Sequence, residues 1–220
     1  MNHGRHVPRM EEHMRETLLS ILVAAIAYLL GCFSTGLTVS RAKGVDIRNR
    51  GSKNTGASNV LRVMGLKSGL ITFAGDFLKA ALACWIGSLI LPGTTFGIAR
   101  YGMMLAGLFA IIGHNWPVFY GFKGGKGVAC PAAVVFFVDP LWGAVAIVAC
   151  LAVIALTRFI SLGSMTMLFC YMVLMCIVHW GQWAVCLFTV VLFAMCVWRH
   201  RSNIQRLLSG TENRIGQKAK

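Results

Sequence analysis

Long segments without charge dominate this sequence, and they restrict what the chain can fold into. Residues 17–39 contain no charged side chain. Further apolar segments occupy roughly 68–91, 101–120, 128–138, 141–157, 162–178 and 183–198. A helix that crosses a bilayer needs about 20 mostly apolar residues, with about 17 to 25 tolerated. Only 13% of the residues are charged, whereas a soluble domain has about a quarter. The sequence therefore predicts an all-α integral membrane protein, built as one helical bundle.

The positions of the basic residues indicate how many segments cross the membrane. The loops 41–67 and 122–127, the turn 158–161 and the tail after Trp198 hold 16 of the 21 Lys and Arg residues. Seven crossings place these four regions on one side, which the positive-inside rule identifies as the cytoplasm. The N-terminus is then outside and the C-terminus is cytoplasmic. We therefore expect a seven-transmembrane-helix bundle with a short fourth helix.

The segment 128–138 is the uncertain member of this set. It is too short to cross the hydrocarbon unaided, and Asp139 and Pro140 close it. It is either a short tilted helix or one half of a broken segment packed against protein. The second alternative leaves five or six crossings, so the predicted parity depends on this segment.

Charge also divides the chain into three parts. Residues 1–16 form a polar N-terminal extension, 17–200 a single transmembrane domain, and 201–220 a basic cytoplasmic tail that contributes to the functional site. The net charge of +14 is explained by the positive-inside rule and by anionic headgroups, so we expect a lipid bilayer and no nucleic acid as partner. The eight cysteines lie mostly in apolar stretches without metal-ligand spacing. They are interpreted as small buried hydrophobes, and no metal or cofactor is expected.

Two loops combine glycine, hydroxyls, amides and cations. They read "GSKNTGASNVLR" (51–62) and "KGGKG" (123–127). Glycine lets successive backbone N–H groups converge on an anion, and Arg or Lys adds charge and hydrogen-bond donors. Neither loop contains the GxxxxGK[ST] pattern of a P-loop NTPase. The two loops predict phosphate recognition at the cytoplasmic face, and the alternative is an ordinary basic loop that contacts lipid headgroups.

These motifs resemble a known family. "DIRNRGS" (46–52), "GSKNTGASNVLR" (51–62), "GDFLKA" (75–80), "GHNWPVFYGFKGGKGVA" (113–129), "SLGS" (161–164) and "HRSNIQRLLSGTE" (200–212) follow in the order found in bacterial acyl-phosphate:glycerol-3-phosphate acyltransferases of the PlsY type. The resemblance covers residues 17–215. It implies a seven-helix enzyme of the bacterial inner membrane, with its active site on the cytoplasmic face. Such enzymes transfer a fatty acyl group from acyl phosphate to the 1-hydroxyl of sn-glycerol 3-phosphate, giving lysophosphatidic acid and phosphate.

The resemblance also implies roles for particular residues. Residues with implied substrate-binding roles are Ser52, Asn54, Asn59 and Arg62 in the first loop, Lys123, Gly124, Gly125 and Lys126 in the second, and Glu212 in the tail. Implied catalytic residues are His114, Ser161, Ser164, His200 and Asn203. For His114 a structural role is an equal alternative. Asp76 and Lys79, three residues apart in an apolar segment, are predicted to form an ion pair that faces the bundle.

Some positions depart from the family pattern. Near the end of the first apolar segment the usual GSIPxG reads "GCFSTG", with Cys32 and Ser34 in place of Ser and Pro. In the first loop Lys53 and Thr55 replace Gly and Pro. Since the polar groups largely remain, these departures concern the geometry of the loops rather than the activity.

The expected chemistry follows from the donor. An acyl phosphate is an activated mixed anhydride, so direct attack by the 1-hydroxyl needs no acyl-enzyme. Cations and N–H groups would stabilise the departing phosphate. The proton would pass to His200 or to a phosphate oxygen of the donor. Acyl phosphate and glycerol 3-phosphate are the expected partners, with a functional link to the enzyme that makes acyl phosphate. An organic-phosphate transporter or channel is the alternative, and a membrane anchor that binds acidic lipids is a third interpretation.

Overall fold

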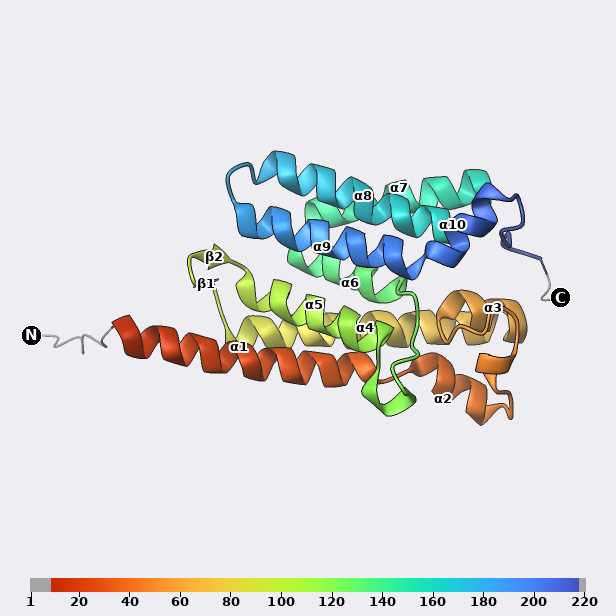
Figure 1. The fold of residues 1–220 in the computed structure, drawn as a ribbon, viewed down its shortest axis with the longest axis horizontal. Coiled ribbons are helices and arrows are strands. Elements are labelled where there is room, and N and C mark those ends of the chain that lie inside the picture. Colours follow the sequence, from red (N-terminus) through yellow and green to blue (C-terminus); the bar gives the residue numbers. More distant parts are fainter. Residues whose placement is uncertain (1–8, 218–220) are drawn as a thin grey trace, which may run out of the picture.

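The computed structural model describes residues 9–217, and these form a helical bundle with one small hairpin (Figure 1). In chain order the elements are α1 (Arg9–Cys32), α2 (Thr35–Ala42), η1 (Ile47–Asn49), α3 (Ala57–Met64), α4 (Leu66–Ile90), β1 (Thr94–Thr95), β2 (Ile98–Ala99), α5 (Tyr101–Asn115), η2 (Val118–Tyr120), α6 (Ala129–Val138), α7 (Pro140–Thr157), α8 (Ile160–Val178), α9 (Trp183–Arg199) and α10 (Arg201–Leu208). The strands β1 and β2 pair antiparallel, with Thr94 opposite Ala99. The all-α class is thereby confirmed apart from this hairpin.

Within residues 9–217, five helical segments are long and apolar enough to cross a membrane: Met10–Ala42, Leu66–Ile90, Tyr101–Tyr120, Pro140–Thr157 and Ile160–Val178. The bent pair α9 and α10, with 61° between its halves, makes a sixth if it is counted as one span. The segment predicted as a short fourth crossing is α6, a helix of only 10 residues. At 1.5 Å per residue it is about 15 Å long, about half the hydrocarbon thickness. Eight of its residues are buried, so protein rather than lipid surrounds most of it.

Small residues let α1 and α5 pack closely. A Cβ on Gly31 would lie 2.2 Å from the carbonyl oxygen of Ala110, and a Cβ on Gly113 would lie 2.2 Å from that of Tyr28. Small residues at such crossings allow backbones to approach without a side chain between them, which is how many membrane helices associate. The other main contacts join α4 to α5 and α6, and α8 to α7 and α9.

The helix ends agree with local signals in the sequence. The Asp139 side chain caps α7 by accepting a hydrogen bond of 3.3 Å from the backbone N–H of Trp142, and Pro140 occupies the first turn. An Asp cap followed by Pro is a favoured helix start, so the break predicted after 138 is confirmed. At the N-terminus, α1 begins at Arg9. The second half of the expected polar extension is therefore helical, and its first eight residues lie outside the described range.

The predicted basic segments gather at one end of the bundle. Figure 1 shows the loop between α2 and α4, the turn between α7 and α8, and α10 toward the right-hand end, with the loop between α5 and α6 right of the middle. The start of α1, the hairpin, the α6–α7 turn and the α8–α9 loop lie at the opposite end. Polar segments distant in sequence are thus brought together at the right-hand end, which we call the basic end.

Candidate active site

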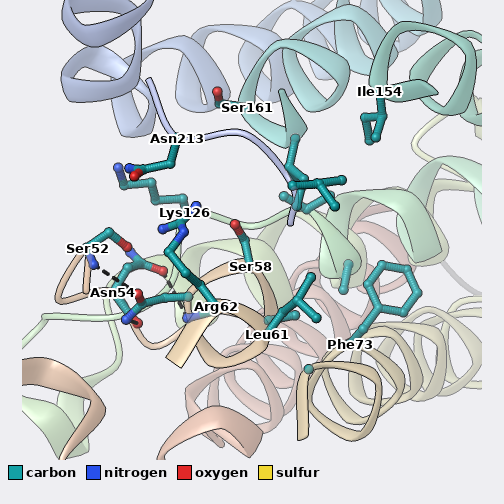
Figure 2. A pocket seen from close by; sticks show the side chains of 18 of the residues that line it. Ser52, Asn54, Ser58, Leu61, Arg62, Phe73, Lys126, Ile154, Ser161 and Asn213 are labelled. Carbon is teal, nitrogen blue, oxygen red and sulfur yellow. Dashed lines mark hydrogen bonds between the residues drawn. The ribbon is translucent and has the colours of Figure 1, made fainter. Parts of the chain in front are cut away.

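A cavity of about 710 Å³ opens near the basic end, between α3, α4, α6, α7, α8 and α10. One part of its wall is polar and is lined by Ser52, Asn54, Asn59, Arg62, Lys126, Ser161, His200, Asn203, Arg206 and Glu212. Another part is apolar and is lined by Leu66, Leu70, Phe73, Ile147, Leu151, Ile154 and Ile160. Figure 2 shows the two kinds of side chain separated, with Arg62 and Lys126 on one side and Phe73 and Ile154 on the other. The cavity can therefore hold a molecule that is anionic at one end and apolar at the other.

Asn59 holds the first glycine-rich loop in shape. Its amide nitrogen donates to the carbonyl oxygens of Arg50 (3.1 Å) and Asn54 (2.8 Å), and its amide oxygen accepts from the N–H of Ser52 (2.9 Å). The side chain is 1% exposed. Because buried polar groups need such partners, these bonds occupy the amide within the loop.

Asn54 connects the two glycine-rich loops. Its side-chain oxygen accepts from the N–H of Gly56 at 2.9 Å, where α3 begins, and its nitrogen reaches the carbonyl of Gly124 at 3.5 Å. Ser52 lies beside it on the cavity wall. The sequence-predicted first-loop residues are thus brought together, with Ser52 and Arg62 the members whose side chains remain available to a ligand.

Arg62 is the cation that α3 brings to the cavity, one turn after Asn59. Burial lowers the pKa of its guanidinium from the usual value, and the neighbouring Arg206 acts in the same direction. Among the described residues 9–217, Arg62 has no ion-pair partner. A half-buried guanidinium of this kind favours an anionic ligand, since it would gain a bidentate partner.

The second loop contributes one lysine to the cavity and uses its other predicted residues for packing. Lys123 is exposed and lies outside the cavity lining. The N–H groups of Gly124 and Gly125 donate to the carbonyls of Asn115 (3.3 Å) and His114 (3.0 Å). Arg199 donates from Nη2 to the carbonyls of both glycines, at 3.1 and 2.6 Å. The two glycines therefore fix the loop onto the end of α5.

Lys126 is the member of this loop that lines the cavity. Its ammonium donates to Oγ of Ser202 at 3.0 Å and to Oδ1 of Asn203. Burial lowers the pKa of Lys126 to about 8, and Arg206 is the next largest cause. Neighbouring cations disfavour the charged form of this lysine, so an anionic ligand would stabilise that form and raise the pKa.

Glu212 is the centre of the polar wall. Its Oε1 accepts from Asn203 Nδ2 (2.7 Å) and from Ser161 Oγ (2.9 Å), and its Oε2 accepts from Arg206 Nε (2.7 Å). The residue is 9% exposed. Three donors from α8 and α10 thus satisfy one buried carboxylate, and Figure 2 shows one of them, Ser161, across the cavity from Arg62.

His200 and Ser164 form a second, deeper pair. Nδ1 of His200 lies 2.9 Å from the carbonyl oxygen of Cys196, to which only a protonated Nδ1 can donate. That tautomer leaves Nε2 as an acceptor, 3.3 Å from Oγ of Ser164. His200 is 2% exposed and Ser164 is fully buried. The structure brings the two residues together, with His200 on the cavity wall and Ser164 outside the lining.

The predicted ion pair between Asp76 and Lys79, both in α4, is confirmed. Nζ of Lys79 lies 2.9 Å from Oδ1 of Asp76 and 3.0 Å from Nδ1 of His114, and it also donates to the carbonyl of Phe33. Ligand atoms of Asp76, His114 and Cys130 lie within 4.8 Å of one another. The lysine ammonium supplies the positive charge in this cluster, so the donor set does not fit a divalent cation.

His114 holds the second loop through this cluster. A Cβ on Gly125 would lie 2.1 Å from Nε2 of His114, so the imidazole packs directly under the loop backbone. The residue is buried at the cavity wall.

Three site residues were not predicted. Arg206 binds Glu212 and lines the cavity, Asn213 follows Glu212 on the same wall, and Arg199 fixes the glycine loop while its Cζ lies 5.3 Å from the centre of the Trp116 ring. Arg206 carried a usable signal, because it follows Asn203 by three residues on one helix and thus shares its face. Arg199 contacts Gly124 and Gly125, which are distant in sequence, and Asn213 lies in an irregular segment. The sequence motifs therefore gave no signal for either residue.

Comparison with known proteins shows the family. The family model described as glycerol-3-phosphate acyltransferase matches residues 21–210. The chain belongs to this family. The glycerol-3-phosphate acyltransferase of Thermoanaerobacter sp. (strain X514) is 42% identical over 202 residues, which cover 91% of this chain and 98% of the relative. That of Synechococcus sp. (strain CC9902) is 43% identical over 206 residues, 92% of this chain and 98% of the relative.

A solved structure extends the likeness to three dimensions. The crystal structure of PlsY, an integral membrane glycerol 3-phosphate acyltransferase in its glycerol 3-phosphate form, matches with a TM-score of 0.81 and 38% identity. The match covers 90% of this chain and 96% of that chain. The resemblance inferred from the motifs is thus confirmed, and the fold is that of an integral membrane acyltransferase.

Proposed function

We propose that this protein transfers a fatty acyl group from acyl phosphate to the 1-hydroxyl of sn-glycerol 3-phosphate, releasing lysophosphatidic acid and phosphate. The proposal depends on one observation, which is that a single cavity has both a cationic part and an apolar part in its wall. Both substrates carry a phosphate and one carries a fatty chain, which is the combination such a cavity accommodates. Family membership supports the acceptor and the membrane setting.

The polar wall divides into two kinds of binding groups. Arg62, Lys126 and Arg206 provide the positive charge, and Ser52 adds a hydroxyl donor next to Arg62. These groups are proposed to hold the two substrate phosphates. Lys123, Gly124 and Gly125 are proposed to act indirectly, through the position of Lys126, because they lie outside the cavity lining.

The Glu212 cluster is proposed to orient the glycerol hydroxyls. Its carboxylate and the hydroxyl of Ser161 lie on the wall opposite Arg62, and Asn203 connects them to Lys126. Asn54 and Asn59 are proposed to shape the phosphate-binding loop. Glycerol 3-phosphate bound between Arg62 and the Glu212 cluster would have its phosphate held by the cations and its hydroxyls held by the cluster. This arrangement would direct the 1-hydroxyl toward the donor.

The proposed reaction is a direct displacement at the acyl carbon. The 1-hydroxyl oxygen forms a bond to the carbonyl carbon, and the bond between that carbon and the phosphate oxygen breaks, with its electron pair leaving on phosphate. The cations stabilise the charge that develops on the departing group. No cofactor takes part, because the mixed anhydride is already activated.

The hydroxyl proton has two possible acceptors, His200 and a phosphate oxygen of the donor. Nε2 of His200 already faces Ser164 at 3.3 Å, and the ring is 2% exposed. A general base must come within hydrogen-bond reach of the proton that it takes. The contact with Ser164 therefore favours the phosphate oxygen, and Ser164, which donates to the carbonyl of Ser161 at 3.0 Å, connects His200 to Ser161. On this account His200→Gln retains a measurable kcat, and complete loss of kcat with unchanged folding would favour His200 instead.

The membrane arrangement is part of the proposal. We propose seven crossings with a short fourth helix α6, an N-terminus outside, and an active site that faces the cytoplasm from the inner membrane. The helices alternate in direction along the bundle, and the basic segments share one end (Figure 1). In this arrangement residues 17–200 form the transmembrane domain after an outer extension (1–16), and the tail 201–220 completes the site with Glu212. Acyl phosphate is chemically labile, so a supply from the enzyme that makes it is expected.

Reconstitution in liposomes tests this function against organic-phosphate transport. The protein is supplied with labelled glycerol 3-phosphate outside the vesicles, with and without palmitoyl phosphate in the bilayer. The enzyme produces labelled lysophosphatidic acid only when palmitoyl phosphate is present, and the vesicle interior gains no labelled glycerol 3-phosphate. Label that accumulates inside as the unchanged ester, without lipid product, would contradict the proposal and support a transporter.

A further inference from the structure

The C-terminal segment 211–217, which we call the strap, forms one wall of the cavity. Glu212 and the five residues after it all line the cavity. Figure 2 shows the thin segment that carries Asn213 passing across it. The strap leaves α10 with a hydrogen bond of 2.8 Å from the N–H of Thr211 to the carbonyl of Arg206. Beyond Glu212 it has no regular secondary structure, so its position depends on what holds it.

The turn between α7 and α8 holds the strap at two points. The N–H of Ile215 donates to the carbonyl of Arg158 at 2.8 Å. In return, Nε and Nη2 of Arg158 donate to the carbonyl of Ile215, at 3.1 and 2.6 Å. Ser161 then donates to Glu212 at 2.9 Å. Arg158 thus pairs with Ile215, and Ser161 pairs with Glu212. Since the first number rises by three while the second falls by three, the two segments run antiparallel.

Two further observations indicate that the Arg158 contact is built into the fold. Arg158 ends α7 with φ of +64°, the left-handed conformation that costs a residue with a side chain about 1 kcal/mol and is usually left to glycine. From this conformation the guanidinium contacts the carbonyl of Ile215 in the strap. Next to it, Cζ of Arg214 lies 5.3 Å from the centre of the Phe159 ring. The turn and the strap are therefore joined by both backbone and side-chain contacts.

This contact limits where Glu212 can lie. Ile215 follows Glu212 by three positions, and an extended chain covers at most about 3.6 Å per residue. Arg206 of α10, which precedes Glu212 in the chain, thus holds the carboxylate directly. The contact of Arg158 with Ile215 restrains the chain that follows Glu212. We propose that Arg158 is a positioning residue that fixes the Glu212 carboxylate against Asn203 and Ser161. The inference rests on the proposed function and adds a residue outside the cavity lining to it.

The first test compares Arg158→Ala and Arg158→Lys with the wild-type protein. A loosened Glu212 misplaces the glycerol hydroxyls, so KM for glycerol 3-phosphate rises and kcat/KM falls about tenfold in Arg158→Ala, since small misplacements of a reacting group reduce rates strongly. Arg158→Lys retains one donor and recovers part of the loss. Lys67→Ala, at an exposed basic position at the start of α4, is the matched control and keeps the wild-type values. The thermal midpoint of all three stays close to that of the wild type, because Arg158 is exposed.

The second test is a double-mutant cycle with Glu212→Gln. If Arg158 acts through Glu212, then Arg158→Ala adds less than about a twofold loss in the Glu212→Gln background, since coupled residues are not additive. Equal losses in both backgrounds would overturn the inference. So would a lower kcat with unchanged KM and a lower thermal midpoint, which indicates a general loss of folded enzyme.

Hydrogen exchange separates this inference from the proposed function. Amides of the strap are expected to exchange faster in Arg158→Ala and in Ile215→Pro, which removes the N–H that binds the Arg158 carbonyl. If the wild-type protein forms no lysophosphatidic acid from acyl phosphate, the proposed function fails while the exchange result still reports the strap contact. If the wild type is active and neither variant changes exchange or KM, the inference alone fails.

Discussion

Nδ2 of Asn203 donates a hydrogen bond of 2.7 Å to Oε1 of Glu212. The other end of the same amide, Oδ1, accepts from the ammonium of Lys126. The orientation of the amide is therefore set by a cation on one side and a carboxylate on the other. This bridge connects the second glycine-rich loop to the strap, and it makes Asn203 the residue on which the geometry of the polar wall depends.

Asn203→Asp tests this bridge with an almost isosteric side chain. The change places a carboxylate oxygen beside Oε1 of Glu212 and neutralises part of the charge on Lys126. We expect kcat/KM for glycerol 3-phosphate to fall by about 10² or more. The hydrogen bond from residue 203 to the Glu212 carboxylate is lost, and the two carboxylates repel each other. The double change Asn203→Asp with Glu212→Gln restores one donor and one acceptor, and it should recover part of the activity.

Asn49→Asp is the matched control for this pair. Asn49 donates to Asp46 at 3.1 Å at an exposed site away from the cavity, so its replacement should leave the kinetics unchanged. If Asn203→Asp is as active as Asn49→Asp, the bridge has no role in the reaction.

Lys126 should limit activity at alkaline pH. Burial and Arg206 lower the pKa of Lys126 to about 8. Below this pH the ammonium is charged and binds phosphate, and above it the free enzyme loses that charge. We therefore expect kcat/KM to be level below about pH 8 and to fall at higher pH, by about tenfold per unit at the limit. The decline in kcat should start at higher pH, because a bound phosphate favours the charged form.

Lys126→Arg is the control for this assignment. Arginine stays charged over the whole range, so the alkaline decline should disappear or move to higher pH even if the maximal rate is lower. An unchanged alkaline decline in Lys126→Arg would assign it to another group.

Gly125 should tolerate no side chain. A Cβ there would lie 2.1 Å from Nε2 of His114, so Gly125→Ala must displace either the imidazole or the loop that carries Lys126. We expect kcat/KM to fall at least about tenfold, because Lys126 moves with the loop. Gly125→Leu should abolish activity. Bulky residues at this position would be harmless if the loop only contacted lipid headgroups.

Gly121→Ala provides the comparison for this change. Gly121 has φ of +62° with no atom within 4 Å of the added Cβ, so the variant introduces backbone strain without a clash. Its stability should decrease by about 1 kcal/mol, while the kinetics of the folded enzyme stay near those of the wild type. Equal kinetic losses at Gly121 and Gly125 would contradict the packing role of His114.

The Asp76–Lys79 pair should behave as a buried ion pair. Lys79 is 7% exposed and Asp76 is 2% exposed, so Lys79→Met leaves an unpaired carboxylate in an apolar helix bundle. This should lower the free energy of unfolding by about 3 to 5 kcal/mol. The double change Asp76→Asn with Lys79→Met removes both charges and should be less destabilising than Lys79→Met alone. Thermal midpoints in detergent measure both, and a double variant less stable than the single one would contradict the pairing.

Much of the helical framework could be predicted from the sequence because bilayer length and apolar composition leave few alternatives. The expected segment 141–157 corresponds to α7, which spans Pro140–Thr157, and the Asp76–Lys79 pair followed from its helical spacing. The role of α6 could not be settled in this way. Its ten residues are stabilised by burial against α4 and its neighbours, and hydropathy does not register such tertiary contacts.

The sequence also could not show which residues of a motif stabilise its loop and which are available to a ligand. Asn59 and Arg62 occur in one motif and both line the cavity, yet the Asn59 amide bonds to the loop backbone, whereas the Arg62 guanidinium is directed to a ligand. The hydrogen bonds that decide this are formed only when the loop folds back on itself. The Arg158 contact with Ile215 joins residues 57 positions apart, and no local pattern reports a backbone carbonyl as a partner.

The central claim is that this site moves an acyl group from acyl phosphate to glycerol 3-phosphate. The most direct measurement incubates the detergent-purified protein with labelled glycerol 3-phosphate and offers palmitoyl phosphate or palmitoyl-CoA in parallel reactions. We predict labelled lysophosphatidic acid from palmitoyl phosphate and none from palmitoyl-CoA, with product formation reduced by about 10² or more in Asn203→Asp. Product formed from palmitoyl-CoA alone, or from neither donor, would contradict the account.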